Sequence, residues 1–442
     1  MGTFHIWTLG CQMNVADSLK LAAGLERLGY HATESDEDAD LVVINTCAVR
    51  QHAEDRAYSR LGMLRKRREQ GAAAKVAVMG CMVGPKTDEL RRRFPFVDAW
   101  ARPQQFDPIL ALVGDAGAGR DVSLGELGSL MGDGMRRTYG LPSGPTAFVP
   151  VIHGCDKFCT YCIVPLRRGR EQSRPSADIL DEVRFLAEHG VREVTLLGQT
   201  VEAYGHDLED EDVDLATIFE GIEAIAGVLR TRFLTSYPRD MTDRIIDAVA
   251  DLPKVCEHFN IPVQSGSNAM LDRMRRGYTV EQFEERVARI RSRMPDAVIA
   301  TDVIVGCPGE TETEFAETIA LLERVRFNVI HVAAYSPRPG TYAERKLADD
   351  VPLEVKKARL QVIEASHAES AAVHNERYVG ATVEVLVERE EQGRATGRTR
   401  GGQLVHFPGI RQIGRLVDVV VEQATPWSLQ ARAVDSIALA TR

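Results

Sequence analysis

Three cysteines within eight residues constrain this chain more than any other feature. Cys155, Cys159 and Cys162 follow the pattern C-x3-C-x2-C, and no fourth cysteine lies close to them in the sequence. Thiolates ligate iron–sulfur clusters, and a [4Fe–4S] cluster has four iron corners. Three local thiolates therefore leave one iron open, much as a catalytic metal keeps an open coordination position. The spacing predicts a cluster that binds and activates a small molecule.

Other uses of this cysteine triplet fit the sequence less well. A structural zinc site usually pairs two knuckles, and only Cys159 and Cys162 form one. Two-cluster ferredoxins use a longer cysteine run in short chains. Disulfides belong to exported proteins, and the N-terminal residues show no export signal. An open iron–sulfur cluster in a cytoplasmic protein is the favoured interpretation.

Length and composition are those of a globular protein with two or three domains. The chain has 442 residues, 44% of them hydrophobic and 27% charged. Its net charge of −10 argues against a protein that coats nucleic acid indiscriminately, although local basic patches can still bind RNA. No uninterrupted apolar run reaches the length of about 18 residues that a membrane helix needs, so we expect no membrane span.

Residues 1–115 alternate between short Val/Ile-rich runs and helical patterns. The runs at residues 4–9, 41–44 and 76–79 read as strands of a parallel sheet that is covered on both faces. Cys11, Cys47 and Cys81 each come just after one of them.

Ligands of open α/β sheets bind outside the carboxyl ends of the strands, so the topology should gather these three thiols at one edge. Three buried structural cysteines are the alternative, because free cysteine is often buried. The matching positions favour a second three-thiolate cluster, formed by Cys11, Cys47 and Cys81.

The rest of the chain divides into three parts. Residues 116–146 are rich in Gly and Pro and read as a linker, and residues 147–372 repeat a strand–helix pattern about six times. Such repeats predict a full or partial β/α barrel, with active-site residues at the carboxyl ends of its strands. Residues 375–438 carry several short strands with Gly-containing turns, which predict a small all-β barrel.

Several arginine groups are candidates for RNA phosphate contacts. A solvated turn is the alternative for the C-terminal group, and a solvated helix face is slightly preferred for residues 65–68. The candidates are Arg394, Arg398 and Arg400; Arg65, Lys66, Arg67 and Arg68; and Arg167, Arg168 and Arg170.

Ordered motifs along nearly the whole chain resemble the radical S-adenosylmethionine (SAM) methylthiotransferases. Within that family, Cys11-Gln-Met-Asn14 and the segment 46–56 are most similar to the enzymes that act on N6-(dimethylallyl)adenosine in tRNA. The motifs that carry the resemblance are residues 8–14, 45–50, 53–56, 79–81, 153–162, 164–170, 196–199, 262–267, 302–306, 308–311 and 335–340.

The resemblance implies an α/β protein made of an N-terminal parallel α/β domain, a radical-SAM partial β/α barrel and a C-terminal TRAM barrel that binds RNA. It implies two [4Fe–4S] clusters and SAM as cofactors. Cys155, Cys159 and Cys162 would hold the cluster that cleaves SAM to a 5′-deoxyadenosyl radical, and that radical would take hydrogen from C2 of the adenine. Cys11, Cys47 and Cys81 would hold an auxiliary cluster that supplies sulfur. Gln199 and Gln264 are candidate SAM contacts, with polar core residues as the alternative.

The implied substrate is the anticodon stem-loop of tRNA, modified next to the anticodon by a monomer that receives electrons from a reducing protein. The alternatives are a methylthiotransferase for a ribosomal protein, one for threonylcarbamoyladenosine tRNA, and an iron–sulfur electron carrier. Residues 200, 202 and 307 depart from the family pattern, which affects contact details rather than the chemistry. Cys256 and Cys307 match no cluster position and read as packing residues, and Glu310 reads as a helix cap.

Overall fold

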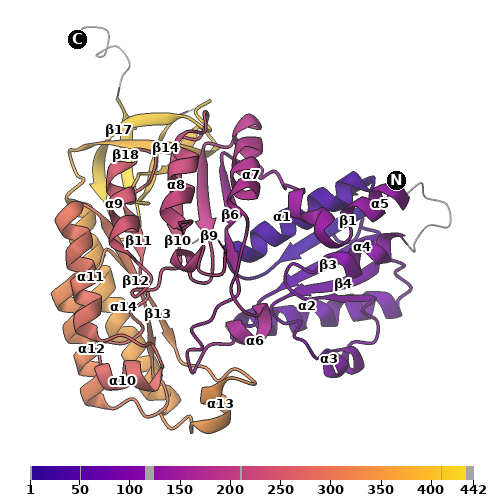
Figure 1. Ribbon diagram of the computed structural model, residues 1–442, viewed down its shortest axis with the longest axis horizontal. Coiled ribbons are helices and arrows are strands. Elements are labelled where there is room, and N and C mark those ends of the chain that lie inside the picture. Colours follow the sequence, from indigo (N-terminus) through magenta and orange to yellow (C-terminus); the bar gives the residue numbers. More distant parts are fainter. Residues whose placement is uncertain (1, 50, 115–123, 210–211, 410, 435–442) are drawn as a thin grey trace.

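The computed structural model describes residues 2–49, 51–114, 124–209, 212–409 and 411–434. Arg50 of the second motif and the domain boundaries expected near residues 115 and 438 lie outside these ranges. Figure 1 shows three units: the N-terminal α/β unit on the right, the central strand–helix unit, and the C-terminal barrel above it. The predicted fold class is confirmed in all three.

The N-terminal unit is a five-stranded parallel sheet in the order β2-β1-β3-β4-β5. This is the flavodoxin-like order, in which a ligand crevice forms where the chain changes direction between β1 and β3. β3 is buried along its whole length, as expected for a central strand covered by helices on both faces. The strands are β1 (Gly2–Thr8), β2 (Tyr30–Ala32), β3 (Leu41–Thr46), β4 (Lys75–Gly80) and β5 (Ala99–Ala101).

Helices cover both faces of this sheet and enclose one apolar core on each. Leu21, Leu25 and Ile109 belong to one core, and Leu61 and Trp100 to the other. The helices are α1 (Gln12–Arg27), α2 (Gln51–Glu69), α3 (Asp88–Arg93) and α4 (Asp107–Gly114), followed by α5 (Leu124–Leu130) and the 3-10 helix η1 (Gly132–Arg137) on the way to the central unit.

The central unit contains two parallel three-stranded sheets, ordered β10-β9-β6 and β11-β12-β13. They adjoin where the Ser236 amide donates to the Asn260 carbonyl oxygen at 3.0 Å. The six strands form a partial barrel with a large apolar core. They are β6 (Thr146–Pro150), β9 (Glu193–Leu197), β10 (Arg230–Leu234), β11 (His258–Asn260), β12 (Val298–Val305) and β13 (Val329–Ala334); a hairpin of β7 (Ile152–His153) and β8 (Gln172–Ser173) follows β6.

The helices of this unit lie on the outside of the barrel (Figure 1). Several begin at a Thr or Asp whose side chain accepts a hydrogen bond from the first turn, as in the capping boxes at Asp214, Thr279 and Thr311. No described helix is long and apolar enough to span a membrane. The helices are α6 (Val164–Arg168), α7 (Ser176–Glu188), η2 (Val201–Ala203), α8 (Leu215–Glu223), α9 (Asp243–Asp251), α10 (Asn268–Arg273), α11 (Val280–Arg293), α12 (Glu312–Val325), α13 (Tyr342–Lys346) and α14 (Leu353–Glu376).

The C-terminal unit is a closed barrel in the order β14-β15-β16-β18-β17. Alternating residues of its strands, among them Val385, Val387 and Val419, fill a small core around Phe407. The strands are β14 (Thr382–Glu391), β15 (Arg394–Arg398), β16 (Leu404–Pro408), β17 (Leu416–Ala424) and β18 (Leu429–Ala433).

Buried arginines attach this barrel to the central unit. Arg230 is fully buried and donates hydrogen bonds to the carbonyl oxygens of Arg398 and Glu384 and to the Glu384 carboxylate. Arg232 donates to the carbonyl oxygens of Arg400 and Thr399, both at 2.6 Å. These contacts fix the loop between β15 and β16 against β10.

Arg400 makes the reciprocal contact. Its guanidinium binds the Glu257 carboxylate and donates to the carbonyl oxygens of Pro253 and Val255. The expectation that Arg400 faces RNA phosphate is therefore wrong, because its donors are used to hold the two units together. Arg398 stays half-exposed beside Glu388, and Arg394 donates to Gln430.

Replacing Arg230 with methionine should destabilise the attachment. The change removes donors from two carbonyl oxygens and leaves Glu384 without its cation, so we expect the free energy of unfolding to fall by about 2–4 kcal/mol in urea denaturation. Arg432, which pairs with Glu422 on the exposed barrel surface, is the control, and Arg432→Met should cost less than about 1 kcal/mol. Equal effects of the two substitutions would contradict this account.

Candidate functional site

All six predicted cluster cysteines line one cavity of about 920 Å³. Cys11, Cys47 and Cys81 follow β1, β3 and β4 of the N-terminal sheet. The other three follow the β6–β7 segment of the barrel. The cavity thus lies where the carboxyl ends of strands from two separate sheets face each other, which is where both kinds of fold bind ligands.

Asn14 connects the loops that carry the first three thiols. Its side-chain amide donates to the carbonyl oxygens of Leu9 and Thr46, at 2.7 and 2.9 Å, just before Cys11 and Cys47. Asn45 in turn donates to the Asn14 carbonyl oxygen at 2.8 Å. This buried network explains the asparagine three residues after Cys11, because it fixes the ends of β1 and β3 relative to each other.

Glycine precedes Cys11, Cys81 and Cys155. Gly80 and Gly154 show the steric reason. Gly80 has a φ of +96°, and a Cβ there would lie 2.4 Å from the Asn45 side chain and 2.5 Å from the Thr46 carbonyl oxygen. Gly154 has a φ of +75°, and its Cβ would lie 1.9 Å from the carbonyl oxygen of Arg170. Only glycine adopts these turns without strain, so both positions determine where the next thiol points.

The loop from Cys155 to Cys162 is held from several sides. Thr160 donates through its amide and hydroxyl to the Met274 and Arg273 carbonyl oxygens, both at 3.0 Å. Arg276 is buried, and one of its nitrogens lies 3.4 Å from Cys159 Sγ. Cys155 Sγ lies 3.5 Å from the Thr200 hydroxyl. The three sulfur atoms are therefore presented by a fixed loop.

The six thiols are free, and most are buried. Burial raises the pKa of Cys81 to about 11 and that of Cys162 to about 12, and it also raises the pKa of Cys155. Without a metal these three thiols are protonated at neutral pH, so metal binding must displace their protons. Within the described ranges, no three His, Cys, Asp or Glu side chains converge on a single ion. A [4Fe–4S] cluster does not require its thiolates to converge on one point, because each thiolate binds a separate iron.

Gln199 and Gln264 both line the cavity, as the sequence placed them near strand ends. The side-chain oxygen of each is buried and has no hydrogen-bond partner among the described residues. Gln264 also has a φ of +72°, a strained conformation, and its backbone pairs with Val303 of β12. Two unpartnered acceptors beside the thiols suit a ligand that donates hydrogen bonds.

The barrel interior adds polar residues that the sequence analysis did not single out. Asn260 donates to the Asp302 carboxylate at 3.1 Å, and His331 lies on the edge strand β13; all three line the cavity. Leu197, Leu234, Val298, Ala300 and Val329 form apolar parts of the same wall. The cavity therefore combines apolar walls with a few convergent polar groups, as ligand sites usually do.

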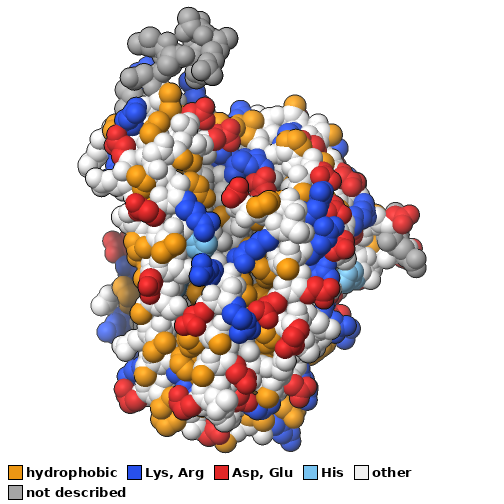
Figure 2. Space-filling model, turned by 90° about the vertical axis from the view of Figure 1, so that its left-hand side faces the viewer, with side chains coloured by type: hydrophobic (Ala, Val, Ile, Leu, Met, Phe, Trp, Pro, Cys, Tyr) orange, Lys and Arg blue, Asp and Glu red, His pale blue; other side chains and the backbone are white. Residues whose placement is uncertain are grey.

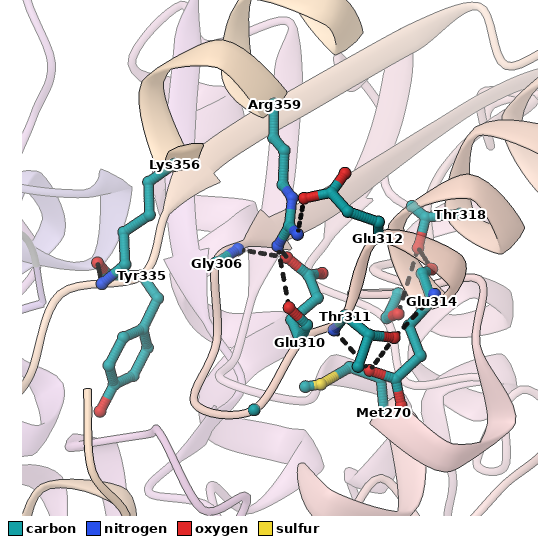
Figure 3. Close-up of polar contacts among 12 residues, drawn as sticks. Met270, Gly306, Glu310, Thr311, Glu312, Glu314, Thr318, Tyr335, Lys356 and Arg359 are labelled. Atoms are coloured by element: carbon teal, nitrogen blue, oxygen red, sulfur yellow. Dashed lines mark hydrogen bonds and ion pairs between the residues drawn. The ribbon is translucent and has the colours of Figure 1, made fainter. Parts of the chain in front are cut away.

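The loop after β12 is fixed by the network in Figure 3. The buried Glu310 carboxylate accepts hydrogen bonds from the Gly306 amide at 2.5 Å and from Arg359 at 2.7 Å. Thr311, not Glu310, is the N-cap of α12, where it forms a capping box with Glu314. The expectation that Glu310 caps the helix is therefore wrong, and its role is to tie the loop to α14.

A further ion pair joins two of the sequence motifs across the units. Arg338, of the motif at 335–340, binds Glu54 at 3.2 Å, and its side chain is almost fully buried. Glu54 lies in α2, in the motif at 53–56. Motifs almost 300 residues apart in sequence therefore meet at one interface beside the cavity.

The far end of the cavity reaches the C-terminal barrel. Trp427, on the turn between β17 and β18, is 61% exposed and packs edge-on against His367, with ring centroids 5.1 Å apart. Asn375 on α14 donates to the carbonyl oxygens of Thr425 and Pro426 and holds this turn in place. Trp427, His367 and Asn375 all line the cavity.

Three arginines and a histidine lie next to this rim. His374 and Arg291 both contact the Arg326 carbonyl oxygen, and burial together with the nearby charge of Arg377 lowers the pKa of Arg291. Among the described residues, no carboxylate forms an ion pair with Arg291, Arg326 or Arg377. Figure 2 shows basic side chains gathered around a histidine on the face that carries α11. We call Arg291, Arg326, Arg377 and His374 the basic patch.

The remaining predicted residues fall into simple categories. Arg65 pairs with Glu69 on α2, and Arg67 and Arg68 reach from this helix to Asp36 and Asp98, so these side chains are engaged within the protein, which fits the preferred interpretation without an RNA contact. Cys256 and Cys307 are buried away from the cavity, and Cys307 packs in an apolar cluster with Met270 and Tyr335, among others. Arg168 is buried rather than exposed to RNA.

Comparison with known proteins covers all three units. Residues 149–322 match the radical SAM superfamily, residues 3–101 match the uncharacterized protein family UPF0004, and residues 376–434 match the TRAM domain. Among solved structures, the chain is similar to the radical S-adenosylmethionine methyltransferase TsrM from Kitasatospora setae, with a TM-score of 0.56, 15% identity, and coverage of 90% of this chain and 81% of TsrM. It also resembles the cobalamin-dependent radical enzyme OxsB, with a TM-score of 0.52, 13% identity, and coverage of 82% and 56%. At such low identity these structures support the fold alone.

Curated relatives are similar over nearly the full length. The tRNA-2-methylthio-N(6)-dimethylallyladenosine synthase of Dehalococcoides mccartyi is 43% identical over 98% of this chain and 99% of its own length. The protein of the same name from Chloroflexus aurantiacus is 41% identical over 97% and 90%. With the three units in the same order and six thiols facing one cavity, the chain belongs to the radical-SAM tRNA-2-methylthio-N(6)-dimethylallyladenosine synthase family.

Proposed function

We propose that this chain is a tRNA methylthiotransferase that converts N6-(dimethylallyl)adenosine next to the anticodon into its 2-methylthio derivative. The observation that carries the proposal is the meeting of two three-cysteine sets in one cavity. One open cluster would suffice to generate a radical, whereas inserting sulfur calls for a second site that holds it. Family membership supports the tRNA substrate.

The proposed cofactors are two [4Fe–4S] clusters and SAM. Cys155, Cys159 and Cys162 would hold the radical-SAM cluster, and Cys11, Cys47 and Cys81 the auxiliary cluster. When bound, this cofactor set supplies the electron, the radical that takes hydrogen from adenine C2, and the sulfur and methyl group. The donor set fits, because the six free thiols share one cavity and leave an open iron in each cluster.

The protein's own part is to bind, orient and exclude water. Gln199 and Gln264 would accept hydrogen bonds from the SAM ammonium group, since their buried oxygens lack protein partners. Asn260 and Asp302 present polar groups deeper in the barrel. The apolar strand residues around them keep a reactive radical away from water and from unproductive side chains.

We propose that the RNA enters along the rim that the barrel and α14 share. A base would stack on the exposed ring of Trp427, which the Asn375 hydrogen bonds hold in place. The basic patch would contact the phosphates next to that base, because its arginines lack carboxylate partners among the described residues. His374 directly precedes the cavity-lining Asn375, so patch and rim are continuous.

The protein would act in the cytoplasm as a monomer, with a separate protein as electron donor. A monomer suffices because one chain supplies every thiol of the cavity. A donor is required because SAM cleavage consumes an electron that the residues lining the cavity do not provide.

Nucleoside analysis of a deletion strain tests the substrate. Mass spectrometry of total tRNA nucleosides should show loss of 2-methylthio-N6-(dimethylallyl)adenosine and accumulation of its unthiolated precursor. A plasmid copy should restore the product, and a copy carrying Cys47→Ala should not. Unchanged 2-methylthio nucleosides in the deletion strain would reject the tRNA substrate, and a mass shift in a ribosomal protein would then identify the alternative.

Replacing Trp427 with alanine should weaken tRNA binding. Loss of one stacked base costs about 1–3 kcal/mol, which corresponds to roughly a 5- to 150-fold rise in the Kd for the anticodon stem-loop. Trp427→Phe should retain most of the affinity, and SAM cleavage without RNA should not change. Leu353 is the control, because it is similarly exposed at the start of α14. An unchanged Kd for Trp427→Ala would reject Trp427 as a stacking residue.

A further inference from the structure

Arg168 comes from the central unit, but its guanidinium lies among the thiols of the N-terminal unit. It ends α6, six residues after Cys162 in the sequence. Its side chain is 3% exposed and lines the same cavity as Cys11, Cys47 and Cys81. The sequence analysis placed this arginine on an RNA-facing surface, and its burial excludes that role.

Part of the guanidinium is bound by the N-terminal unit. Nη2 donates to Asn14 Oδ1 at 2.9 Å and lies 3.5 Å from Asp17 Oδ2. Asn14 is the residue that ties together the loops of Cys11 and Cys47. Arg168 is therefore anchored to the scaffold of the auxiliary thiols rather than to its own unit.

The guanidinium lies beside the Cys81 thiol, but its other terminal nitrogen makes no well-formed hydrogen bond among the described residues. Arg168 Nη1 is buried, and no described residue accepts a hydrogen bond from it. A buried cationic donor without an acceptor is unfavourable, because it has lost its hydrogen bonds to water. Cys81 is close enough that the charge of Arg168 partly offsets the burial that raises the pKa of this thiol. An anion in the cavity would supply the missing acceptor.

Arg276, beside the other thiol set, offers an instructive contrast. Its three nitrogens are all used: they contact the Tyr278 hydroxyl at 3.0 Å, the Pro262 carbonyl oxygen at 2.9 Å and Cys159 Sγ at 3.4 Å. Arg276 needs no further ligand. Of these two arginines beside the thiols, Arg168, which crosses between the units, is the one that keeps an unpartnered donor.

A [4Fe–4S] cluster with three thiolate ligands is an anion whose sulfur atoms accept hydrogen bonds, and such bonds and nearby charge set its reduction potential. We infer that Arg168 is a positioning residue of the auxiliary cluster, and that its free Nη1 donates to a cluster sulfur. The inference rests on the proposed two-cluster function. Its consequence is that the central unit, through Arg168, fixes the place of the auxiliary cluster and raises its reduction potential.

The test isolates the auxiliary cluster in the full-length chain. Cys155, Cys159 and Cys162 are replaced together by alanine, the protein is reconstituted anaerobically, and the remaining cluster is titrated with dithionite and followed by electron paramagnetic resonance. Arg168→Met in this background should shift the midpoint potential to more negative values and change the g values. Arg168→Lys keeps the charge and should shift the potential less.

Arg170→Met is the matched control, because Arg170 lies two residues away but is 72% exposed and pairs with Asp156. It should leave potential and spectrum unchanged. Identical potentials and g values for the Arg168→Met variant and its parent, at equal iron content, would overturn the inference. If Arg168→Met does not fold, Arg168→Gln, which also removes the charge, decides by the same criterion. Absence of any cluster in the triple-alanine parent would instead reject the two-cluster function.

Discussion

The structure depends on one constraint: the carboxyl ends of two separate parallel sheets must face each other across a single cavity. Each sheet on its own gathers three thiols, and in the proposed clusters each set would leave one iron open. Only the opposed arrangement places both sets within reach of one substrate. The chemistry of a radical and of sulfur transfer can then act on the same base without release of an intermediate.

Buried charged side chains fix that arrangement. Arg168 and Arg338 reach from the central unit to Asn14 and Glu54 of the N-terminal unit, and Arg230 anchors the C-terminal barrel on the other side. Buried ion pairs add little net stability but are costly to break, so they specify one relative position of the units. A site that is proposed to hold two clusters, SAM and a base together requires such a fixed relative position.

The sequence predicted most of the scaffold and the thiols, for identifiable reasons. β3 and β4 contain continuous apolar runs and the capping Thr residues have clear local signals, whereas β2 and β5 have only three residues each and were missed. Cys11, Cys47 and Cys81 were found because the carboxyl ends of parallel strands lie at one edge of a sheet, so residues far apart in sequence come together there. Arg168 and Arg400 were misjudged because their partners lie in other units. Glu310 was misjudged because its partner Arg359 lies 49 residues away in the same unit, and a distant partner leaves no local signal. Trp427 carried only the weak signal of an aromatic residue in a turn.

The central claim is that each of the two three-cysteine sets holds its own iron–sulfur cluster. Its most direct test is iron and sulfide analysis of anaerobically reconstituted protein. The account predicts about eight iron atoms per chain, and about four after either Cys11, Cys47 and Cys81 or Cys155, Cys159 and Cys162 are replaced together by alanine. Cys256→Ala should leave the iron content unchanged, because this buried cysteine lies outside the cavity. An iron content of about four in the unaltered protein, lost entirely in one triple variant and unaffected in the other, would contradict it.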